Sequence, residues 1–321
     1  MNETTQENFL SKLRDPISIV RDGELFRTIS VEAAWNILEA ADYDVTHGVA
    51  ATTNTVLSDQ YISYVNKYDG RGMEVLEIGC GTGLLTAGLV QSPLIDLCVS
   101  MDISRSFLQT ALARAKSSTA DPRLVLLCSD LNDLPFSDQS FDAVFGNSIL
   151  HHIYDYQNLL ENLRRLLRPG GRLVFSEPCQ QGKSLISFFL SAILKLDLTQ
   201  ASPYFSDDER RRIQGIFSVH MRESLASSDP SIKLKWEDKH IFDTSKLAEI
   251  AKCLGFSEFE RRNTNPIRDG LRGSAERTLQ IVGVTKSLER FRFLFDSFQE
   301  QYVKMLDTHT ETPHQFLIFT R

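Results

Sequence analysis

Two adjacent histidines, His151 and His152, follow an apolar run in the stretch FGNSILHHIYD, residues 145–155. An imidazole can bind a metal, move a proton or pack in a core. Successive residues of an α-helix point about 100° apart, so these two rings would not readily chelate one ion. No carboxylate–histidine set elsewhere in the sequence supplies further ligands, and we therefore expect no metal site. Two interpretations stay open: a structural pair, or a pair with one ring facing a substrate.

A glycine loop, LEIGCGTG at residues 76–83, offers a second kind of chemistry. Gly79, Gly81 and Gly83 stand between a predicted strand and a predicted helix, where glycines permit a tight turn and let a ligand approach the backbone closely. The fingerprint of dinucleotide-binding proteins would require a glycine at position 84, where this chain has leucine. The sequence therefore argues against a nicotinamide dehydrogenase.

Polar residues end the three strands predicted after the glycine loop: Asp102, Asp130 and Asn147. In open parallel sheets, ligands bind beyond the carboxyl ends of the strands. A carboxylate at the position of Asp102 can accept hydrogen bonds from both hydroxyls of a ribose. The alternatives are that Asp102 caps a helix and that Asp130 merely ends a strand. Four consecutive strand ends, one with the glycine loop and three with a polar residue, nevertheless indicate a binding site along one edge of the sheet.

The elements that position these residues alternate short apolar strands with helical patterns, which is typical of a parallel α/β sheet. Predicted strands cover residues 73–79, 97–102, 123–130 and 141–147, and a fifth strand follows Pro169, Gly170 and Gly171 in the stretch RPGGRLVFSEP. The pattern then changes, because residues 180 to about 236 hold helical segments without strands. Residues 242–262 predict a helix and a sixth strand, and a second helical stretch at 287–306 precedes a last apolar run at 314–321. Two helical insertions therefore interrupt the end of the predicted sheet.

The composition is that of a soluble globular protein, with 42% apolar and 24% charged residues in 321. The formal net charge of −7 argues against a nucleic acid as the main partner. Five cysteines without C-x-x-C spacing favour reduced thiols and a cytoplasmic location. The most apolar stretch, residues 185–194, is about half as long as a bilayer span, and the N-terminus has no signal-peptide pattern. We expect no transmembrane segment.

The glycine spacing GxGxG resembles the first motif of the class I S-adenosylmethionine-dependent methyltransferases. EIGCGTG, Asp102, SDLNDLPFSDQSFDAVF, LHHI and RLLRPGGRLVFSEP follow one another in the order and spacing of the small-molecule branch of that family. The resemblance is close over residues 71–179 and looser over 241–262 and 313–321. It implies a Rossmann-like sheet of seven strands, the last one antiparallel, with helical cap insertions. It also implies S-adenosyl-L-methionine as the cofactor and S-adenosyl-L-homocysteine as the product.

The resemblance implies specific cofactor contacts for residues of these motifs. Asp102 would bind the ribose hydroxyls, Ile103 would pack on the adenine, and Asp130 with the backbone of Leu131 would read the adenine edge. Asn147 would lie beneath the sulfonium. The loop residues expected to shape the methionine end of the pocket are Glu77, Gly79, Cys80, Gly81 and Gly83, with the thiol of Cys80 incidental.

Methyl transfer from a sulfonium is an in-line displacement that depends mainly on alignment of the nucleophile. A general base helps only where the acceptor must lose a proton, as a hydroxyl does. The candidates for that base are His151, His152 and Glu177. The stretch AADYDVTHG at residues 40–48 resembles the segment before the core where relatives place a tyrosine against the cofactor. Tyr43 is the candidate for that contact, and ordinary packing is the alternative.

The expected organisation follows from the motifs and the insertions. The predicted segments are an N-terminal helical cap (1–70), the cofactor-binding core (71–179), a helical insertion forming a lid or acceptor pocket (180–240), a continuation of the core (241–262), a second helical insertion (263–312) and the final core strand (313–321). The expected function is methyl transfer to a small molecule, most plausibly to oxygen in secondary-metabolite, sugar or quinone-like biosynthesis, by a monomer or homodimer. The alternatives are methyl transfer to nitrogen or carbon, and a non-catalytic protein that binds S-adenosylmethionine.

Overall fold

The structure is a computed structural model of the 321-residue chain. It describes residues 7–9, 11–13, 25–26, 55–65, 72–116, 123–132, 134–225, 238–263, 270–306 and 314–321.

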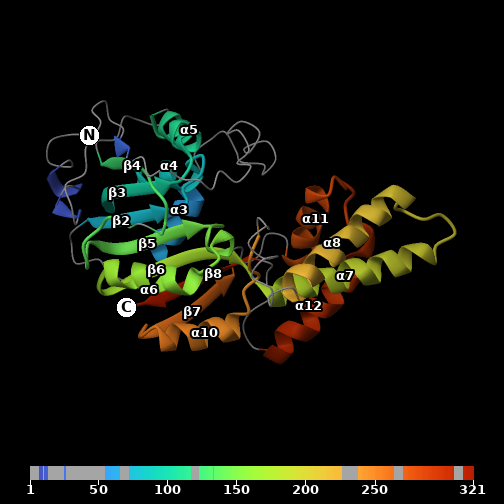
Figure 1. The fold of residues 1–321 in the computed structure, drawn as a ribbon. Helices are drawn as coiled ribbons and strands as arrows, with labels where there is room; N and C mark the ends of the chain where they lie inside the picture. The colour runs from blue at the N-terminus through green and yellow to red at the C-terminus, as the bar shows by residue number, and fades with distance from the viewer. Residues whose placement is uncertain are drawn as a thin grey trace.

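A single mixed β-sheet forms the centre of the molecule (Figure 1). Its strand order is β1-β4-β3-β2-β5-β6-β8-β7. The strands are β1 (Leu25–Phe26), β2 (Met73–Ile78), β3 (Ile95–Asp102), β4 (Leu124–Cys128), β5 (Phe141–Asn147), β6 (Leu167–Pro178), β7 (Glu258–Asn263) and β8 (His314–Thr320). All pairs from β1 to β6 are parallel, whereas β8 runs antiparallel to both β6 and β7. The predicted seven-stranded sheet with its last strand antiparallel is confirmed, and the short edge strand β1 adds an eighth.

Helices cover both faces of this sheet, as the continuous apolar runs of its central strands require. On one face, α3 (Thr55–Ser63), α4 (Leu84–Leu89) and the end of α5 (Arg105–Lys116) pack in one hydrophobic cluster with β2 and β3. On the other face lie α6 (Tyr156–Leu166) and α10 (Thr244–Cys253). The leucines Leu159, Leu160, Leu163 and Leu166 form the buried stripe of α6 that the sequence predicts.

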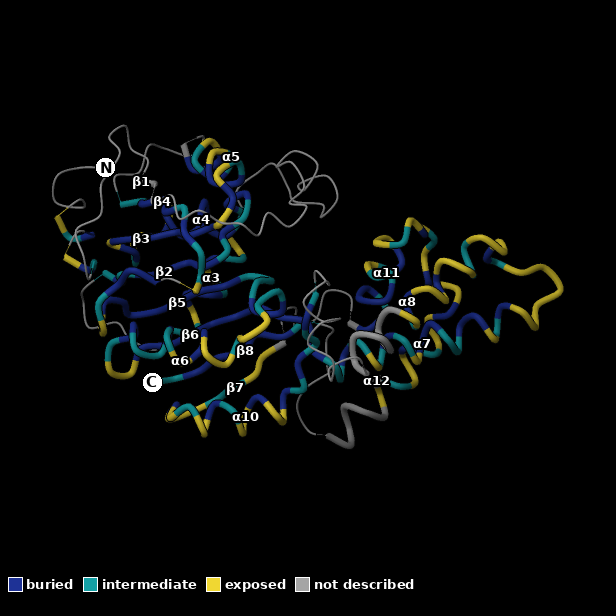
Figure 2. The backbone as a smooth tube through the Cα atoms, viewed as in Figure 1, coloured by how far each residue is buried: buried dark blue, intermediate teal, exposed yellow. Residues whose placement is uncertain are grey.

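A helical lobe projects from the end of the sheet where β6 passes into α7 (Figure 1). It comprises α7 (Gln180–Leu198), α8 (Asp207–Leu225), α11 (Gly270–Ile281), the short 3₁₀ helix η3 (Glu289–Phe291) and α12 (Arg292–Leu306). Its buried residues form a hydrophobic cluster separate from the clusters of the sheet. Buried positions of these helices face inward and exposed ones line the outside (Figure 2).

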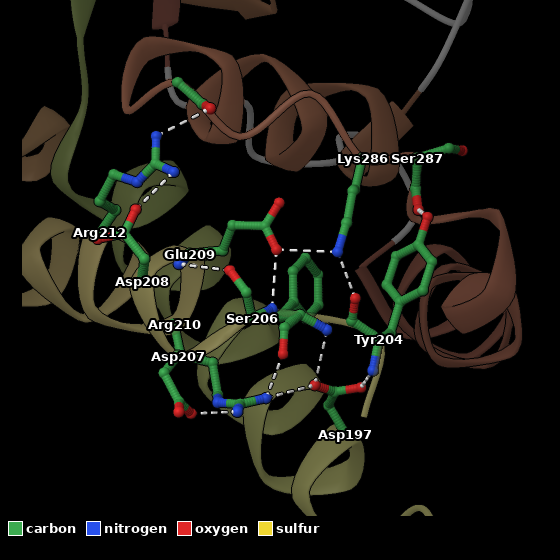
Figure 3. Close-up of polar contacts among 12 residues, drawn as sticks. Asp197, Tyr204, Ser206, Asp207, Asp208, Glu209, Arg210, Arg212, Lys286 and Ser287 are labelled. Carbon is green, nitrogen blue, oxygen red and sulfur yellow. Dashed lines mark hydrogen bonds and ion pairs between the residues drawn. The ribbon is translucent and has the colours of Figure 1, made fainter. Parts of the chain in front are cut away.

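A buried carboxylate fixes the turn between α7 and α8 (Figure 3). Asp197 is fully buried and accepts hydrogen bonds from the backbone N–H of Tyr204, at 2.5 Å, and of Phe205, at 3.1 Å. Arg210 of α8 contributes a guanidinium 3.3 Å from the same carboxylate. A buried charge is tolerated only when it is paired and hydrogen-bonded, and here both conditions hold. None of the helices in the described part of the chain is long and apolar enough to cross a membrane.

Candidate functional site

The glycine loop leaves β2 in a backbone conformation that glycine adopts without strain. Gly79, Gly81 and Gly83 have φ angles of 61°, 54° and 84°. A Cβ atom added at Gly81 would meet no atom within 4 Å, so the backbone there is open to a ligand. A Cβ at Gly79 would instead lie 2.4 Å from Cγ1 of Ile149. The loop therefore packs directly against the turn that leads to the two histidines.

Asp102 ends β3 beside this loop and is 9% exposed. Its Oδ2 accepts the N–H of Gly81 and its Oδ1 the N–H of Ser104, both at 2.8 Å. Burial raises the pKa of Asp102, and these backbone bonds offset part of that rise. A carboxylate has about four acceptor sites, so these bonds do not use its full capacity, and an incoming hydroxyl can still be accepted. Ile103, the next residue, leaves 38% of its apolar side chain exposed.

Glu77 and Cys80 lie buried around the base of the loop. Oε2 of Glu77 accepts hydrogen bonds from the hydroxyls of Thr86, at 2.6 Å, and Ser100, at 2.7 Å. This carboxylate therefore ties α4 to β3 behind the glycines. Burial raises the pKa of Glu77 to about 7. Burial also raises the pKa of the Cys80 thiol, which keeps that thiol protonated and unreactive.

The remaining predicted cofactor residues lie at the ends of the neighbouring strands. Asp130 follows β4, is half-buried and closes a turn with the backbone and side-chain amides of Asn132, at 2.8 and 2.9 Å. Leu131 packs at the border of the main hydrophobic cluster. Asn147 ends β5, and its side-chain oxygen accepts a hydrogen bond of 3.2 Å from the hydroxyl of Tyr61. Tyr43 lies outside the described residues.

Tyr61 of α3 was not anticipated from the sequence. It is fully buried, and its hydroxyl also donates to the carbonyl of Gly146 at 3.0 Å. Burial, with the nearby carboxylates of Glu177 and Glu77, raises the pKa of Tyr61 well above its ordinary value. The phenol therefore stays protonated and acts as a donor to the end of β5. No motif marks this tyrosine, because its role depends on where α3 packs.

The two histidines lie on a one-turn 3₁₀ helix, η1 (Leu150–His152), which the buried carboxylate of Glu177 holds. Oε1 of Glu177 accepts the N–H of Ile149, at 3.0 Å, and of Leu150, at 2.7 Å. Its Oε2 lies 2.6 Å from Nδ1 of His151. Glu177 therefore binds to the start of the turn and fixes the orientation of one imidazole at the same time. These bonds leave little of the carboxylate for direct contact with a substrate.

Asp238 completes the cluster from a segment that is distant in the sequence. Its Oδ1 lies 3.4 Å from Nε2 of His151 and 3.5 Å from Nδ1 of His152. The imidazole rings have centroids 4.0 Å apart. The geometric argument against a shared ion does not hold, because the two rings lie side by side even though successive residues of a 3₁₀ helix point about 120° apart. The sequence offered no signal for Asp238 beyond an acidic residue in the run EDKH.

Charge dominates the titration of this cluster. Burial lowers the pKa of His151, but Glu177 and Asp238 outweigh that effect and raise it to about 9. His151 holds the pKa of Asp238 well below its ordinary value. Burial, with the positive charge of Lys183, lowers the pKa of half-buried His314 to about 4. At neutral pH His151 is therefore protonated, and both of its ring nitrogens act as hydrogen-bond donors. The side chain of His152 is 32% exposed, so it is the more accessible imidazole.

The similarity to known proteins lies in the segment that carries the glycine loop and the two histidines. Residues 76–175 match the family model described as "Methyltransferase domain". An O-methyltransferase of Aspergillus nomiae is 31% identical over 107 residues, which are 33% of this chain and 47% of that protein. The 27-O-demethylrifamycin SV methyltransferase of Amycolatopsis mediterranei is 35% identical over 107 residues, 33% of this chain and 39% of that protein. The match thus spans less than half of each of these relatives.

Among solved structures, phosphoethanolamine N-methyltransferase 2 of Haemonchus contortus in complex with S-adenosyl-L-methionine has a TM-score of 0.51 and 16% identity. That likeness covers 88% of this chain and 56% of the other, and it supports the fold. The family match and the curated relatives agree with the GxGxG loop and with the sheet that carries it. Residues 76–175 therefore form a methyltransferase domain, with the sheet of the class I S-adenosylmethionine-dependent methyltransferases around them, and S-adenosylmethionine is the cofactor of that domain.

Proposed function

We propose that this protein transfers the methyl group of S-adenosylmethionine to a hydroxyl oxygen of a small molecule. One observation carries the proposal: the open glycine loop and the turn with the two histidines touch each other through Gly79 and Ile149. The cofactor side and a polar cluster suited to an acceptor are therefore neighbours at the carboxyl edge of the sheet. The curated relatives matched by the core include O-methyltransferases, which favours oxygen over nitrogen or carbon.

The residues around the glycine loop fit the cofactor. S-adenosylmethionine supplies a sulfonium-bound methyl group that is already activated for displacement. Asp102 has acceptor capacity left for the two ribose hydroxyls, and the exposed face of Ile103 suits an adenine ring. The open backbone at Gly81 suits close approach of the rest of the molecule. The role of this chain on that side is binding and alignment.

On the acceptor side, we propose that the imidazole of His152 faces the hydroxyl that is methylated, because it is the more exposed of the two imidazoles. His151, fixed by Glu177, orients the turn. Tyr61 and Asn147 fix the end of β5 between the two halves of the site. The helical lobe begins directly after β6, and Lys183 of its first helix acts electrostatically on Asp238 and His314. We assign the acceptor's outer wall to that lobe.

The test uses S-adenosylmethionine carrying a ¹³C-labelled methyl group and a panel of phenol, sugar and quinol-type hydroxyl acceptors. Mass spectrometry detects the methylated product, and the ¹³C chemical shift of the new methyl group tells whether it is bound to oxygen, nitrogen or carbon. We expect an O-methyl signal. A signal from N-methyl or C-methyl, or binding of the cofactor without any transfer across the panel, would contradict the proposal.

A variant of Asp102 tests the cofactor site itself. Asp102→Ala removes hydrogen bonds to a charged group, each worth about 1.5–3 kcal/mol, so the affinity for S-adenosylhomocysteine should fall by one to two orders of magnitude. Asp96→Asn is the matched control, because Asp96 is an exposed carboxylate near the opposite end of the same strand. Isothermal titration calorimetry measures both. Equal affinities of the two variants would remove Asp102 from the ribose site.

A further inference from the structure

Two imidazoles and one carboxylate converge around Asp238. Nδ1 of His151 is 2.6 Å from the carboxylate of Glu177, which fixes a proton on that nitrogen. Nε2 of the same ring then points at Oδ1 of Asp238, 3.4 Å away, and Nδ1 of His152 lies 3.5 Å from the same oxygen. A charge-assisted hydrogen bond would be about 2.7–2.9 Å long. Both separations to Oδ1 are longer than that. His151 and Asp238 are nevertheless paired, so a cation that binds here displaces the proton on Nε2 of His151.

The two separations to Oδ1 of Asp238 match the edges of a tetrahedral metal site. With metal–nitrogen and metal–oxygen distances of about 2.0–2.2 Å, ligand atoms lie about 3.4 Å apart. The nitrogen and oxygen atoms offered by His151, His152 and Asp238 all lie within 4.8 Å of one another. We propose that Nε2 of His151, Nδ1 of His152 and Oδ1 of Asp238 bind one divalent transition-metal cation, of which Zn²⁺ is the model ion. Two imidazoles and one carboxylate suit Zn²⁺, Fe²⁺ or Co²⁺ and disfavour Mg²⁺ and Ca²⁺, which prefer oxygen.

The surroundings hold the ligands in place before any ion arrives. Oε2 of Glu177 accepts a hydrogen bond from Nδ1 of His151, the ring nitrogen that does not face Asp238. This carboxylate–histidine arrangement orients metal ligands in proteins. The segment after Asp238 is bound to the same turn, since the N–H groups of Lys239 and His240 donate to the carbonyl of His151 at 2.9 and 3.2 Å. Phe242 continues this anchoring through its N–H, 3.0 Å from the carbonyl of Pro178. Both halves of the site are therefore fixed to the ends of β5 and β6.

Three protein ligands leave a coordination position open, as in catalytic rather than structural metal sites. Resting on the proposed function, we assign that position to the acceptor's hydroxyl. A metal-bound hydroxyl releases its proton to water more readily than a free one, because the cation lowers its pKa. The oxygen then forms its bond to the methyl carbon as the carbon–sulfur bond breaks. In this arrangement the two imidazoles are ligands, and neither acts as a base.

Direct metal binding tests the site without relying on activity. The full chain, purified without a polyhistidine tag and freed of metal with EDTA, is titrated with Zn²⁺ by calorimetry and with Co²⁺ by visible absorption. We expect one ion per chain and ligand-field bands of a nitrogen and oxygen environment. Asp238→Ala and His152→Ala should weaken Zn²⁺ binding by at least about tenfold, and Glu177→Gln by about 10–100-fold. His240→Gln, an imidazole in the same segment outside the cluster, should bind Zn²⁺ as the parent does.

The outcomes separate this inference from the proposed function. S-adenosylhomocysteine binding, measured on the same samples, should be unchanged by EDTA or by Asp238→Ala, because the side chain of Asp238 is 40% exposed and makes no described contact with the glycine loop or Asp102. Absence of stoichiometric Zn²⁺ binding, or unchanged binding in Asp238→Ala, overturns the metal site while the cofactor site stands. Zn²⁺ binding without binding of S-adenosylhomocysteine overturns the proposed function instead. Methyl transfer that persists in EDTA would overturn the assigned role of the ion.

Discussion

At the scale of single residues, the buried carboxylate of Glu77 lowers the stability of the folded state when it is ionised. It is fully surrounded by protein, and burial raises its pKa to about 7 from an ordinary value of 4.5. Between these two values the folded state binds more protons than the unfolded state. The free energy of unfolding therefore falls as the pH rises from 4.5 to 7, by about 3 kcal/mol in total.

We predict that Glu77→Gln removes this pH dependence. The amide oxygen can still accept from Thr86 and Ser100, so the fold should be kept and the variant should be more stable than the parent at pH 8. At pH 4.5 the two proteins should be nearly equal. Urea unfolding at intervals from pH 4.5 to pH 8 measures the difference, with the exposed Glu258→Gln as control. Parallel profiles for parent and Glu77→Gln would show that Glu77 does not titrate in this range.

The residues that could be predicted from the sequence are those whose role is set by a local backbone pattern. The glycines of the loop and Asp102 at a strand end fall in this class, because strand, turn and helix follow one another directly. Asp238 and Tyr61 could not be predicted, since each reaches the site from a segment distant in the sequence. The closeness of the two imidazole rings could not be predicted for a related reason, because it accompanies side-chain contacts with Glu177 and Asp238 that backbone spacing does not reveal.

At the scale of elements, Glu74 at the start of β2 binds three segments together. Its carboxylate accepts from Nδ2 of Asn8, at 2.6 Å, and from Nζ of Lys12, at 2.7 Å. Arg168 at the start of β6 forms a further ion pair with it. Burial would raise the pKa of Glu74, but these hydrogen bonds outweigh it and lower the pKa to about 2. A lowered pKa stabilises the folded state above pH 4.5, and this stabilisation is lost as the pH falls through 2.

We predict that Glu74→Gln destabilises the protein by about 3 kcal/mol at pH 7, because Lys12 loses its ion pair and Arg168 keeps only the one with Asp142. The deficit should shrink as the pH falls from 4.5 toward 2, where the parent loses the same charge. Denaturant unfolding at pH 7, 4.5 and 3 follows the change. Glu161→Gln on the exposed side of α6 is the control. A deficit that is the same at all three pH values would mean that the effect is steric.

The elements themselves were predicted well where burial is continuous. The strand predicted at 141–147 is β5 with the same bounds. The apolar run there is short and is bounded by polar turn residues on both sides, so both ends of the strand can be located in the sequence. The two-residue strand β1 was not predicted, since it carries too few residues for any pattern and exists only through its pairing with β4. The proposed division into core and insertions stays a prediction.

At the scale of the whole molecule, the sheet and the helical lobe have separate hydrophobic clusters. Each can therefore gain or lose stability by itself. The turn between α7 and α8 is the point where the lobe depends on one buried charge, Asp197, with its contacts to two backbone amides and Arg210. A substitution at Asp197 should therefore lower the stability of the lobe more than that of the sheet.

We predict that Asp197→Asn lowers the stability of the lobe by about 3 kcal/mol, because it weakens the backbone bonds to Tyr204 and Phe205 and leaves Arg210 without its buried partner. Hydrogen exchange should then speed up in α7, α8, α11 and α12 while β2, β3 and β5 stay protected. Asp208→Asn on the exposed side of α8 is the matched control. Binding of S-adenosylhomocysteine should be unchanged, because no described contact of the glycine loop or of Asp102 comes from the lobe. If hydrogen exchange accelerated equally in sheet and lobe, the two would form one cooperative unit. The lobe, to which we assign the outer wall of the acceptor pocket, could then not unfold or move independently of the cofactor site.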